Sequence, residues 1–285
     1  MGRLEKYKGR CLDILLCLVA AMVCAPIVLV VLSSFKSGWE LKENLLPILE
    51  ESSKKEHWKI LPCYPEISHY SKLLLKTPQF FVVFWNSIKM TGIILLGQAV
   101  VAIPSGWAFA KFRFRGRKLI MSIYNILMLM PFQVTMLPTY LVMERLGLMN
   151  TQASIILPAV FSTFPVFIIY RGFLEIPDEL IEAAKVDGAG DFTIFIKIGI
   201  PLGKSGILSA MVLGFLEYWN MMEQPLAFLK DKKLWPLSLY LPEVNSKEAG
   251  IVLAAAVIIL IPAVFVFIMG QDYLENGIIA TGSKG

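Results

Sequence analysis

The sequence predicts an all-α integral membrane protein with six transmembrane helices. Of its 285 residues, 56% are hydrophobic and 17% are charged, whereas soluble domains average about 45–50% apolar and about 25% charged residues. The mean hydropathy is +0.64. Long apolar runs alternate with short polar ones and lack the period-two pattern of barrel strands, so helices must satisfy the backbone inside the bilayer.

Six apolar runs are long enough to cross a bilayer, because a helical span needs about 20 residues. The predicted spans are, in chain order, Cys11–Leu32, Ile88–Ala110, Leu119–Leu141, Ala153–Tyr170, Ser205–Met222 and Gly250–Met269. The first run is longer than the roughly 7–15 apolar residues of a signal peptide, and no A-x-A cleavage site follows it, so we expect it to remain as a span. Prolines lie within or beside most runs, which predicts kinked helices.

The distribution of basic residues predicts the orientation. Six of the seven arginines lie on one side if the N-terminus is cytoplasmic, and residues 111–118, KFRFRGRK, carry five basic residues in eight. Short basic loops stay in the cytoplasm. We therefore expect a multi-pass protein of the cell (inner) membrane with both termini cytoplasmic. Its predicted parts are a tail over 1–10, a membrane domain over 11–270 with an outer loop at 33–80, and a tail over 271–285.

Several other classes of site have little support in the sequence. Cys11, Cys17 and Cys24 share one apolar run, and neither they nor Cys63 have metal-site or redox spacing. His57 and His69 lie in the outer loop without a carboxylate partner that spacing supports. We expect no catalytic residue, no metal site, no bound cofactor and no nucleic-acid partner. GIPLGKS, residues 199–205, has three residues between its glycines where a phosphate-binding loop has four, and one of them is proline.

The segment between the fourth and fifth spans, residues 176–201, predicts two short surface helices. Pro177 suits a first helical turn, and Gly188 stands where a C-terminal cap belongs. Asp191 is placed to cap a second helix over 192–198. We expect that helix to end at the glycine and proline that follow, Gly199 and Pro201.

The first of these helices has two alanines on one predicted face. Leu180, Ala183, Ala184 and Asp187 follow i, i+3, i+4, i+7 spacing, so they should share a shallow face that another protein could approach closely.

The same segment resembles the EAA loop of ABC-importer permease subunits. Glu182-Ala183-Ala184 is followed after three residues by Gly188, and after nine more by Ile198, then Ile200 and Pro201. The family pattern has leucine where Ile200 stands. In that family the loop is a pair of coupling helices that seats in a cleft of a separate ATP-binding subunit. The resemblance implies a coupling role for Glu182, Ala183, Ala184, Asp187, Gly188, Ile198 and Pro201.

Segments outside the loop are similar to the maltose-type carbohydrate uptake permeases, and specifically to the six-span partner of a two-permease set. They are Trp85-Asn86-Ser87, and residues 108–118, 137–151, 218–226 and 271–285. The tail departs at residues 279–283, IATGS, where the family tends to have a Thr-Ala-Gly-Gly/Ala-Val run.

This resemblance implies a subunit that forms half of a translocation path for a carbohydrate, with an oligosaccharide as the expected substrate. It also implies that the subunit has no ATPase site of its own. The implied partners are a second permease subunit, a dimer of ATP-binding subunits that holds ATP and Mg, an extracellular or periplasmic solute-binding protein, and membrane lipid. Three alternatives are an ABC permease for a non-sugar solute, a gradient-driven secondary transporter, and a membrane scaffold that transports nothing.

Polar groups inside spans are candidates for the substrate path, because they are costly there and usually face protein or water. Lys89 lies about one turn inside the second span and could instead snorkel to the interface. The other candidates lie near the outer ends of the fifth and third spans, and they are Glu217, Tyr218, Trp219, Asn220, Glu223, Gln224, Gln133, Thr135, Thr139 and Tyr140. Aromatic faces beside amides and carboxylates suit sugars. The alternative is an interfacial aromatic belt with hydrogen bonds between helices.

Overall fold

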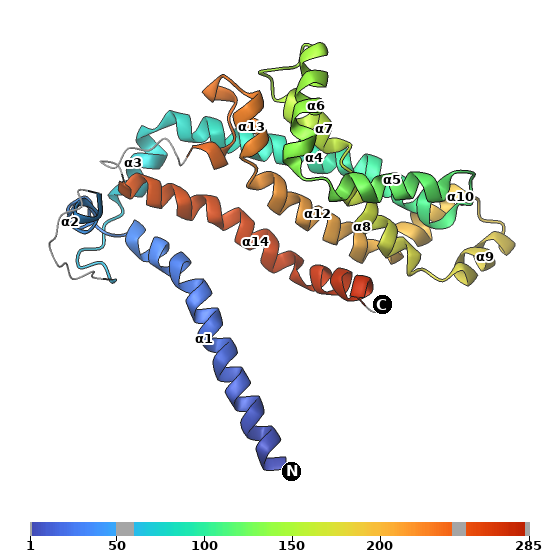
Figure 1. Ribbon diagram of the computed structural model, residues 1–285, viewed down its shortest axis with the longest axis horizontal. Coiled ribbons are helices and arrows are strands. Elements are labelled where there is room, and N and C mark those ends of the chain that lie inside the picture. Colours follow the sequence, from blue (N-terminus) through green and yellow to red (C-terminus); the bar gives the residue numbers. More distant parts are fainter. Residues whose placement is uncertain (1, 50–59, 241–248, 283–285) are drawn as a thin grey trace. The chain divides into compact units, whose positions relative to one another are not determined.

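The computed structural model describes residues 2–49, 60–240 and 249–282, and within these residues every regular element is a helix (Figure 1). The predicted all-α fold is confirmed. The four longest helices are α1 (Gly2–Ser34), α4 (Pro78–Lys111), α12 (Lys204–Trp219) and α14 (Ala249–Gly282). The shorter α-helices are α2 (Gly38–Leu49), α3 (Ser68–Lys76), α5 (Arg117–Leu129), α6 (Phe132–Arg145), α7 (Ala153–Val160), α8 (Thr163–Leu174), α9 (Asp178–Val186), α10 (Asp191–Ile194), α11 (Ile200–Leu202) and α13 (Glu223–Phe228). A π-helix, η1, covers Phe195–Gly199, and two 3-10 helices cover Lys232–Leu234 and Leu237–Leu239.

Four segments of the described chain are long and apolar enough to cross a membrane as they stand, and they are Leu12–Ser34, Pro78–Lys111, Ala153–Leu174 and Ala249–Leu274. Two more candidates are bent pairs, α5 with α6 at 105°, and Asp191–Leu202 with α12 at 68°. The number of candidates is therefore four, or up to six if each bent pair forms one span. The count of six stays a prediction.

The third predicted span, Leu119–Leu141, is not one continuous helix. It is broken between α5 and α6, where Met130 has an extended backbone with ψ of 126° and Pro131 follows. Proline lacks an N–H donor and disfavours the helical conformation of the residue before it. The kink that proline predicts is therefore present in this segment, and it is as large as 105°.

The ends of three helices also differ from the predicted bounds. The first and last helices extend into the predicted tails, since α1 begins at Gly2 and α14 continues to Gly282, while residues 283–285 and His57 lie outside the described residues. Because α4 begins at Pro78, Lys89 lies about three turns inside the helix rather than one.

The chain divides into two compact units, residues 1–80 with 241–260, and residues 81–240 with 261–285. The first contains the predicted outer loop, which includes α2 and α3. Ser34 Oγ and Tyr70 OH share a hydrogen bond of 2.7 Å, and Glu40 Oε1 accepts one from the Cys63 N–H at 2.7 Å. Burial raises the pKa of Glu40, but the hydrogen bonds from Cys63 and Ser37 outweigh it, so the pKa lies below its ordinary value.

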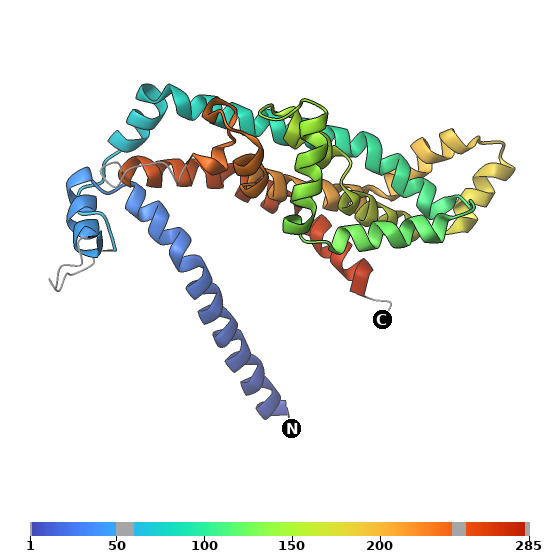
Figure 2. The same ribbon diagram turned by 45° about the horizontal axis from the view of Figure 1, so that its top comes forward.

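The core of the second unit forms where α8 and α12 lie side by side (Figures 1 and 2). Their backbones meet at two glycines. A Cβ added to Gly172 would lie 2.9 Å from the Gly206 Cα, and a Cβ added to Gly206 would lie 2.9 Å from the Gly172 Cα. Small residues let helices approach closely in membranes. Around this crossing the buried cluster includes Trp107, Phe109, Val166, Ile169, Phe173, Ile194 and Ile207.

Candidate functional site

The predicted surface segment, residues 176–201, lies at one end of the second unit, beside the C-terminal end of α4 and the start of α5 (Figures 1 and 2). Its first helix, α9, begins after Pro177, which is the N-cap residue with ψ of 136° and so stands one position before the predicted first turn. Asp178 and Glu179 occupy the first turn, where the helix dipole favours negative charge. Local sequence therefore determines where α9 starts.

The end of α9 is a Schellman motif built on Gly188. The Ala189 N–H donates to the Ala184 carbonyl at 2.9 Å, and the Gly188 N–H donates to the Lys185 carbonyl at 3.0 Å. Gly188 has φ of +82°, a conformation that residues with a side chain rarely adopt. The predicted capping position of Gly188 is confirmed.

Asp191 does not cap the second helix, contrary to the prediction. Gly190 is the N-cap residue, and the Asp191 carboxylate instead pairs with Lys185 at 3.1 Å. Both side chains are more than half exposed, so the pair contributes at most about 1 kcal/mol. The predicted end near Ile198 is also wrong, because the chain stays helical through η1 and α11 and bends at Gly203.

The outward face of this loop is more apolar than predicted. Val186 is 87% exposed and Phe192 is 77% exposed, and neither was a predicted site residue. Ala183 is exposed, but Ala184 packs on the core cluster with Ile181. The expectation that both alanines share an open face is therefore wrong for Ala184. Val186 follows Glu182 and Ala183 by one helical turn, and this spacing could have identified it.

Aromatic packing holds the other end of the loop on the core. A Cβ added to Gly199 would lie 2.7 Å from Trp107 Cζ3, so glycine lets the π-helix approach the indole ring. Trp107 packs edge-on against Phe173, with ring centroids 5.2 Å apart, and also contacts Phe195 at 5.7 Å. Ile198 packs on the same cluster, whereas Pro201 is exposed in the first turn of α11.

Lys111 ties the start of the loop to the end of α4. Its Nζ donates to the Ile176 carbonyl at 2.6 Å and to Asp178 Oδ1 at 2.7 Å. The Lys111 side chain is 6% exposed and that of Asp178 is 72% exposed. The hydrogen bond and charge of Lys111 lower the pKa of Asp178. Lys111 was predicted only as part of the basic segment that sets orientation and of the resembling segment 108–118, and its contact with the loop was not predicted.

A second polar contact joins two predicted path residues that are 90 positions apart. Gln133 Nε2, at the start of α6, donates to both carboxylate oxygens of Glu223, at the start of α13, at 3.2 and 3.3 Å. Both residues are exposed. The pair is therefore an open polar site formed by two separate helices.

The remaining candidates from the fifth span face different environments. Tyr218 and Trp219 are buried, at 8% and 2% exposure, and Trp219 stacks on Phe215 with ring centroids 5.4 Å apart. Glu217 is exposed. Asn220 is also exposed, and its Nδ2 donates to a carbonyl of its own helix.

The other predicted polar residues donate to backbone carbonyls or pack against an aromatic ring. Gln224 Nε2 reaches the Ser154 carbonyl at 3.5 Å, and Thr139 Oγ1 donates to the Thr135 carbonyl at 2.7 Å. Tyr140 packs against Phe228 with ring centroids 5.8 Å apart.

Gln98 was missed by sequence analysis. It is fully buried in α4, and its Nε2 donates to the Ala159 carbonyl at 2.8 Å and to the Tyr218 hydroxyl at 3.1 Å. An uncharged amide within an apolar run is the signal that could have identified it, because such groups form hydrogen bonds between membrane helices.

The GIPLGKS segment does not have the architecture of a phosphate-binding loop. Such a loop connects a strand to a helix, whereas residues 199–205 belong to the bend between α11 and α12. Across the described part of the chain, no three His, Cys, Asp or Glu side chains gather in one place.

Comparison with known proteins relates this architecture to transport systems. Residues 102–280 match the family described as binding-protein-dependent transport system inner membrane component. The arabinooligosaccharides transport system permease protein AraQ of Halalkalibacterium halodurans is 28% identical over 272 residues, which cover 94% of this chain and 93% of that protein. The lactose transport system permease protein LacG of Rhizobium radiobacter is 31% identical over 206 residues, covering 70% of this chain and 74% of that protein. The sn-glycerol-3-phosphate transport system permease protein UgpE of Brucella abortus is 31% identical over 202 residues, covering 69% of this chain and 72% of that protein.

Solved structures show the same relationship. A chain of a bacterial ABC transporter involved in the import of the acidic polysaccharide alginate superposes with a TM-score of 0.81 at 25% identity. The superposition covers 94% of this chain and 97% of that chain. A chain of the MetNI methionine ABC transporter superposes with a TM-score of 0.56 at 18% identity, which shows similarity of fold alone.

Proposed function

The chain belongs to the family of binding-protein-dependent transport system inner membrane components, and from this membership we propose that it forms half of the translocation path of an ABC importer for a carbohydrate. The observation that carries this proposal is the loop over residues 176–201. It presents an exposed apolar face at Val186 and Phe192 and is tied to the end of α4 by Lys111. A gradient-driven secondary transporter or an inert scaffold does not account for that family membership.

The exposed face of α9 and α10 is proposed to seat in a cleft of a separate ATP-binding subunit. ATP and Mg bind to a dimer of those subunits, and this chain contributes no ATPase residues. Movement of the cleft then reaches α4 through Lys111 and reaches α8 through the contact of Trp107 with Phe173. ATP drives the change only because it binds one state of the complex more tightly than the other.

The family and the charge distribution support the remaining parts of the proposed assembly. A second permease subunit completes the path, and both termini lie in the cytoplasm with the basic segment at residues 111–118. A solute-binding protein docks on the opposite side, on the predicted outer loop at 33–80 and on residues 144–152. The glutamates and amides exposed on that side, Gln133 and Glu223 foremost, line the entrance to the path.

The proposed substrate is an oligosaccharide. Relatives named for arabinooligosaccharides and lactose support it, as does the structure named for alginate import. A non-sugar solute is the second candidate, favoured by the relatives named for sn-glycerol-3-phosphate.

Uptake by the reconstituted complex tests this function. Proteoliposomes holding this chain, the second permease and the ATP-binding subunits should import a labelled oligosaccharide only when ATP and the solute-binding protein are present. In the same assay, Glu223→Gln should reduce uptake about tenfold, because hydrogen bonds to a charged group contribute more than those to a neutral one. Uptake by Glu223→Asp, which keeps the charge, should lie between that of Glu223→Gln and that of the wild-type chain.

The experiment tests the carbohydrate assignment and the role of Glu223 independently of each other. Uptake of glycerol phosphate but of no oligosaccharide in the panel would reject the carbohydrate assignment. Undiminished oligosaccharide uptake by Glu223→Gln, at an equal amount of complex, would remove Glu223 from the path and leave the transport function standing.

Lys111→Met is expected to lower uptake about tenfold, because it leaves the carbonyl of the buried Ile176 without a partner, at a cost of about 1–3 kcal/mol. Asp178→Asn should have a smaller effect, because the Asp178 side chain is 72% exposed and asparagine keeps a carbonyl oxygen that can accept a hydrogen bond from Lys111 Nζ. The lowered pKa of Asp178 means that its pairing is complete above the ordinary pKa and is lost only as pH falls through the lowered value. Titration of Asp178 should therefore cause no change in uptake as pH varies near neutrality.

Arg115→Met is the matched control for Lys111→Met. Arg115 lies in the same basic segment and is exposed, and it makes no side-chain hydrogen bond or ion pair with the described residues. Binding-protein-stimulated ATP hydrolysis and uptake are measured for all three variants at equal membrane levels. Equal losses in Lys111→Met and Arg115→Met would show that the charge of the segment matters and that the contact with Ile176 does not.

A further inference from the structure

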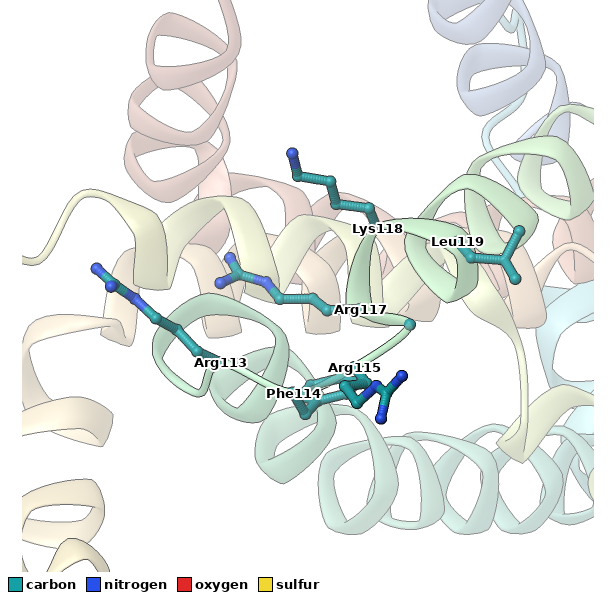
Figure 3. Close-up of a pocket in the computed structure, with 7 residues that line it drawn as sticks. Arg113, Phe114, Arg115, Arg117, Lys118 and Leu119 are labelled. Atoms are coloured by element: carbon teal, nitrogen blue, oxygen red, sulfur yellow. The ribbon is translucent and has the colours of Figure 1, made fainter.

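The segment between α4 and α5 forms a basic hollow of about 640 Å³, lined by the seven consecutive residues 113–119 (Figure 3). The chain turns back there at Gly116, which has φ of +85° and is the N-cap residue of α5. Glycine permits this left-handed conformation at no steric cost. The turn contributes four cationic residues to the lining, and they are Arg113, Arg115, Arg117 and Lys118.

Three of these cations extend to one side of the loop. Figure 3 shows Arg113, Arg117 and Lys118 on that side and Arg115 on the other. Arg117 donates to the Phe112 and Ala110 carbonyls at a long 3.4 Å each. Arg113 and Lys118 make no side-chain hydrogen bond or ion pair with the residues the structure describes. The hollow therefore holds several N–H donors that are available to an anion.

The nearby carboxylate is already bound. Asp178 lies close enough to Arg113 and Arg117 for their charges to lower its pKa, but Lys111 has the larger effect and holds Asp178 Oδ1 at 2.7 Å. The lining residues themselves include no acid. The hollow thus keeps an excess of positive charge.

Exposed apolar side chains flank the cations. Phe112 is 42% exposed, Phe114 is 41% exposed and Leu119 is 67% exposed. Phe114 also contacts Phe109, with ring centroids 5.8 Å apart, which fixes it beside the end of α4. The segment joins one candidate span, α4, to another, the α5–α6 pair, so it lies at the boundary of the membrane. Cations and exposed rings at that depth suit an amphiphile with an anionic head.

We propose that Arg113, Arg117 and Lys118 bind the phosphate headgroup of an anionic phospholipid, with Phe112 and Leu119 against its acyl chains. The three cations are not among the residues proposed for the transport path or the coupling face. Arginine donates two parallel hydrogen bonds to a phosphate, and lysine adds a point charge. A lipid is favoured over a soluble anion because the hollow opens beside apolar groups at the membrane boundary.

Lipid binding by the full chain tests the site. The purified chain in a neutral detergent is titrated with short-chain phosphatidylglycerol or phosphatidylcholine, and bound lipid is counted by native mass spectrometry. Phosphatidylglycerol should bind more tightly, and the triple variant Arg113→Gln, Arg117→Gln, Lys118→Gln should weaken that binding at least about tenfold, since each basic residue near a membrane surface adds to the attraction. Phosphatidylcholine binding should not change.

Two further variants separate the site from general charge and from misfolding. The double variant Arg113→Gln, Lys118→Gln keeps Arg117 and its backbone contacts and should still lose most of the preference. A charge-matched control removes three cations from another exposed segment, and its substitutions are Lys230→Gln, Lys232→Gln and Lys233→Gln. This control should keep the preference for phosphatidylglycerol.

Three results of the lipid titrations would overturn the proposal, and a fourth comes from binding of the ATP-binding subunit. They are equal affinity for the two lipids in the wild-type chain, retention of the preference by both hollow variants, and displacement of phosphatidylglycerol by an equal concentration of inorganic phosphate. If the triple variant loses binding of the ATP-binding subunit while its lipid preference persists, the hollow is a protein contact and the lipid site is rejected.

Discussion

Gly188→Glu is expected to reduce substrate uptake at least about tenfold while the subunit still reaches the membrane. Gly188 has φ of +82°, and a residue with a side chain pays about 1–2 kcal/mol for that conformation. The Schellman motif would then loosen, and α9 would no longer be held at a fixed angle to α10. The glutamate would also add bulk and negative charge beside the exposed face that we propose meets the ATP-binding subunit.

The loss should come from the loop and not from the fold. A Cβ added to Gly188 meets nothing within 4 Å, so the substitution creates no overlap with the core. Gly188→Asn is the matched control, because asparagine tolerates the left-handed region better than most residues. It should retain most of the uptake. Uptake and binding-protein-stimulated ATP hydrolysis are measured at equal membrane levels, and a Gly188→Glu complex with wild-type rates would reject a coupling role for this turn.

Gly206→Leu is expected to prevent correct folding of the second unit. An added Cβ would lie 2.9 Å from the Gly172 Cα, 3.4 Å from the Gly172 nitrogen and 3.4 Å from the Ile168 carbonyl oxygen. These are backbone atoms, so no rotamer change can relieve the overlap, and α8 and α12 would have to separate. Overpacking a tight core costs about 1–3 kcal/mol or more, which is a large part of a typical total stability of about 5–15 kcal/mol.

Thermal unfolding of the detergent-purified chain measures this effect. Gly206→Leu should show a lower midpoint or a loss of protein from the membrane. Gly92→Ala is the control, since it also replaces a helical glycine but its added Cβ meets nothing within 4 Å. That variant should be neutral or stabilised by up to about 1 kcal/mol, because alanine is the better helix former. Equal midpoints for Gly206→Leu and Gly92→Ala would show that the two helices do not depend on this contact.

Local patterns accounted for the features that depend on neighbouring residues along the chain. Apolar run length located the candidate spans, and glycine chemistry located the cap at Gly188. The same kind of reasoning failed where two local signals competed. Asp191 is a good capping residue, but Gly190 takes that position and Asp191 pairs with Lys185. Pro131 predicted a kink in the third span, but a local preference does not set its size, which is 105°.

Contacts between distant segments could not be derived in this way. Lys111 binds Ile176 and Asp178 across more than 60 positions, Gln133 meets Glu223 across 90, and Gly172 meets Gly206 where two helices cross. Each partner is ordinary in its own segment, and nothing in its neighbours indicates which helix it will face.

The sequence by itself determined that this chain is a helical membrane protein, where its helices can form, and which motif carries the family resemblance, because hydropathy and backbone preference act over a few residues. The tertiary structure alone decided which side of the loop is open, since Ala184 packs inward while Val186 and Phe192 stay exposed. It also decided how the loop is tied to α4. Helix packing sets these properties, and packing depends on the shapes of surfaces that lie far apart in the chain.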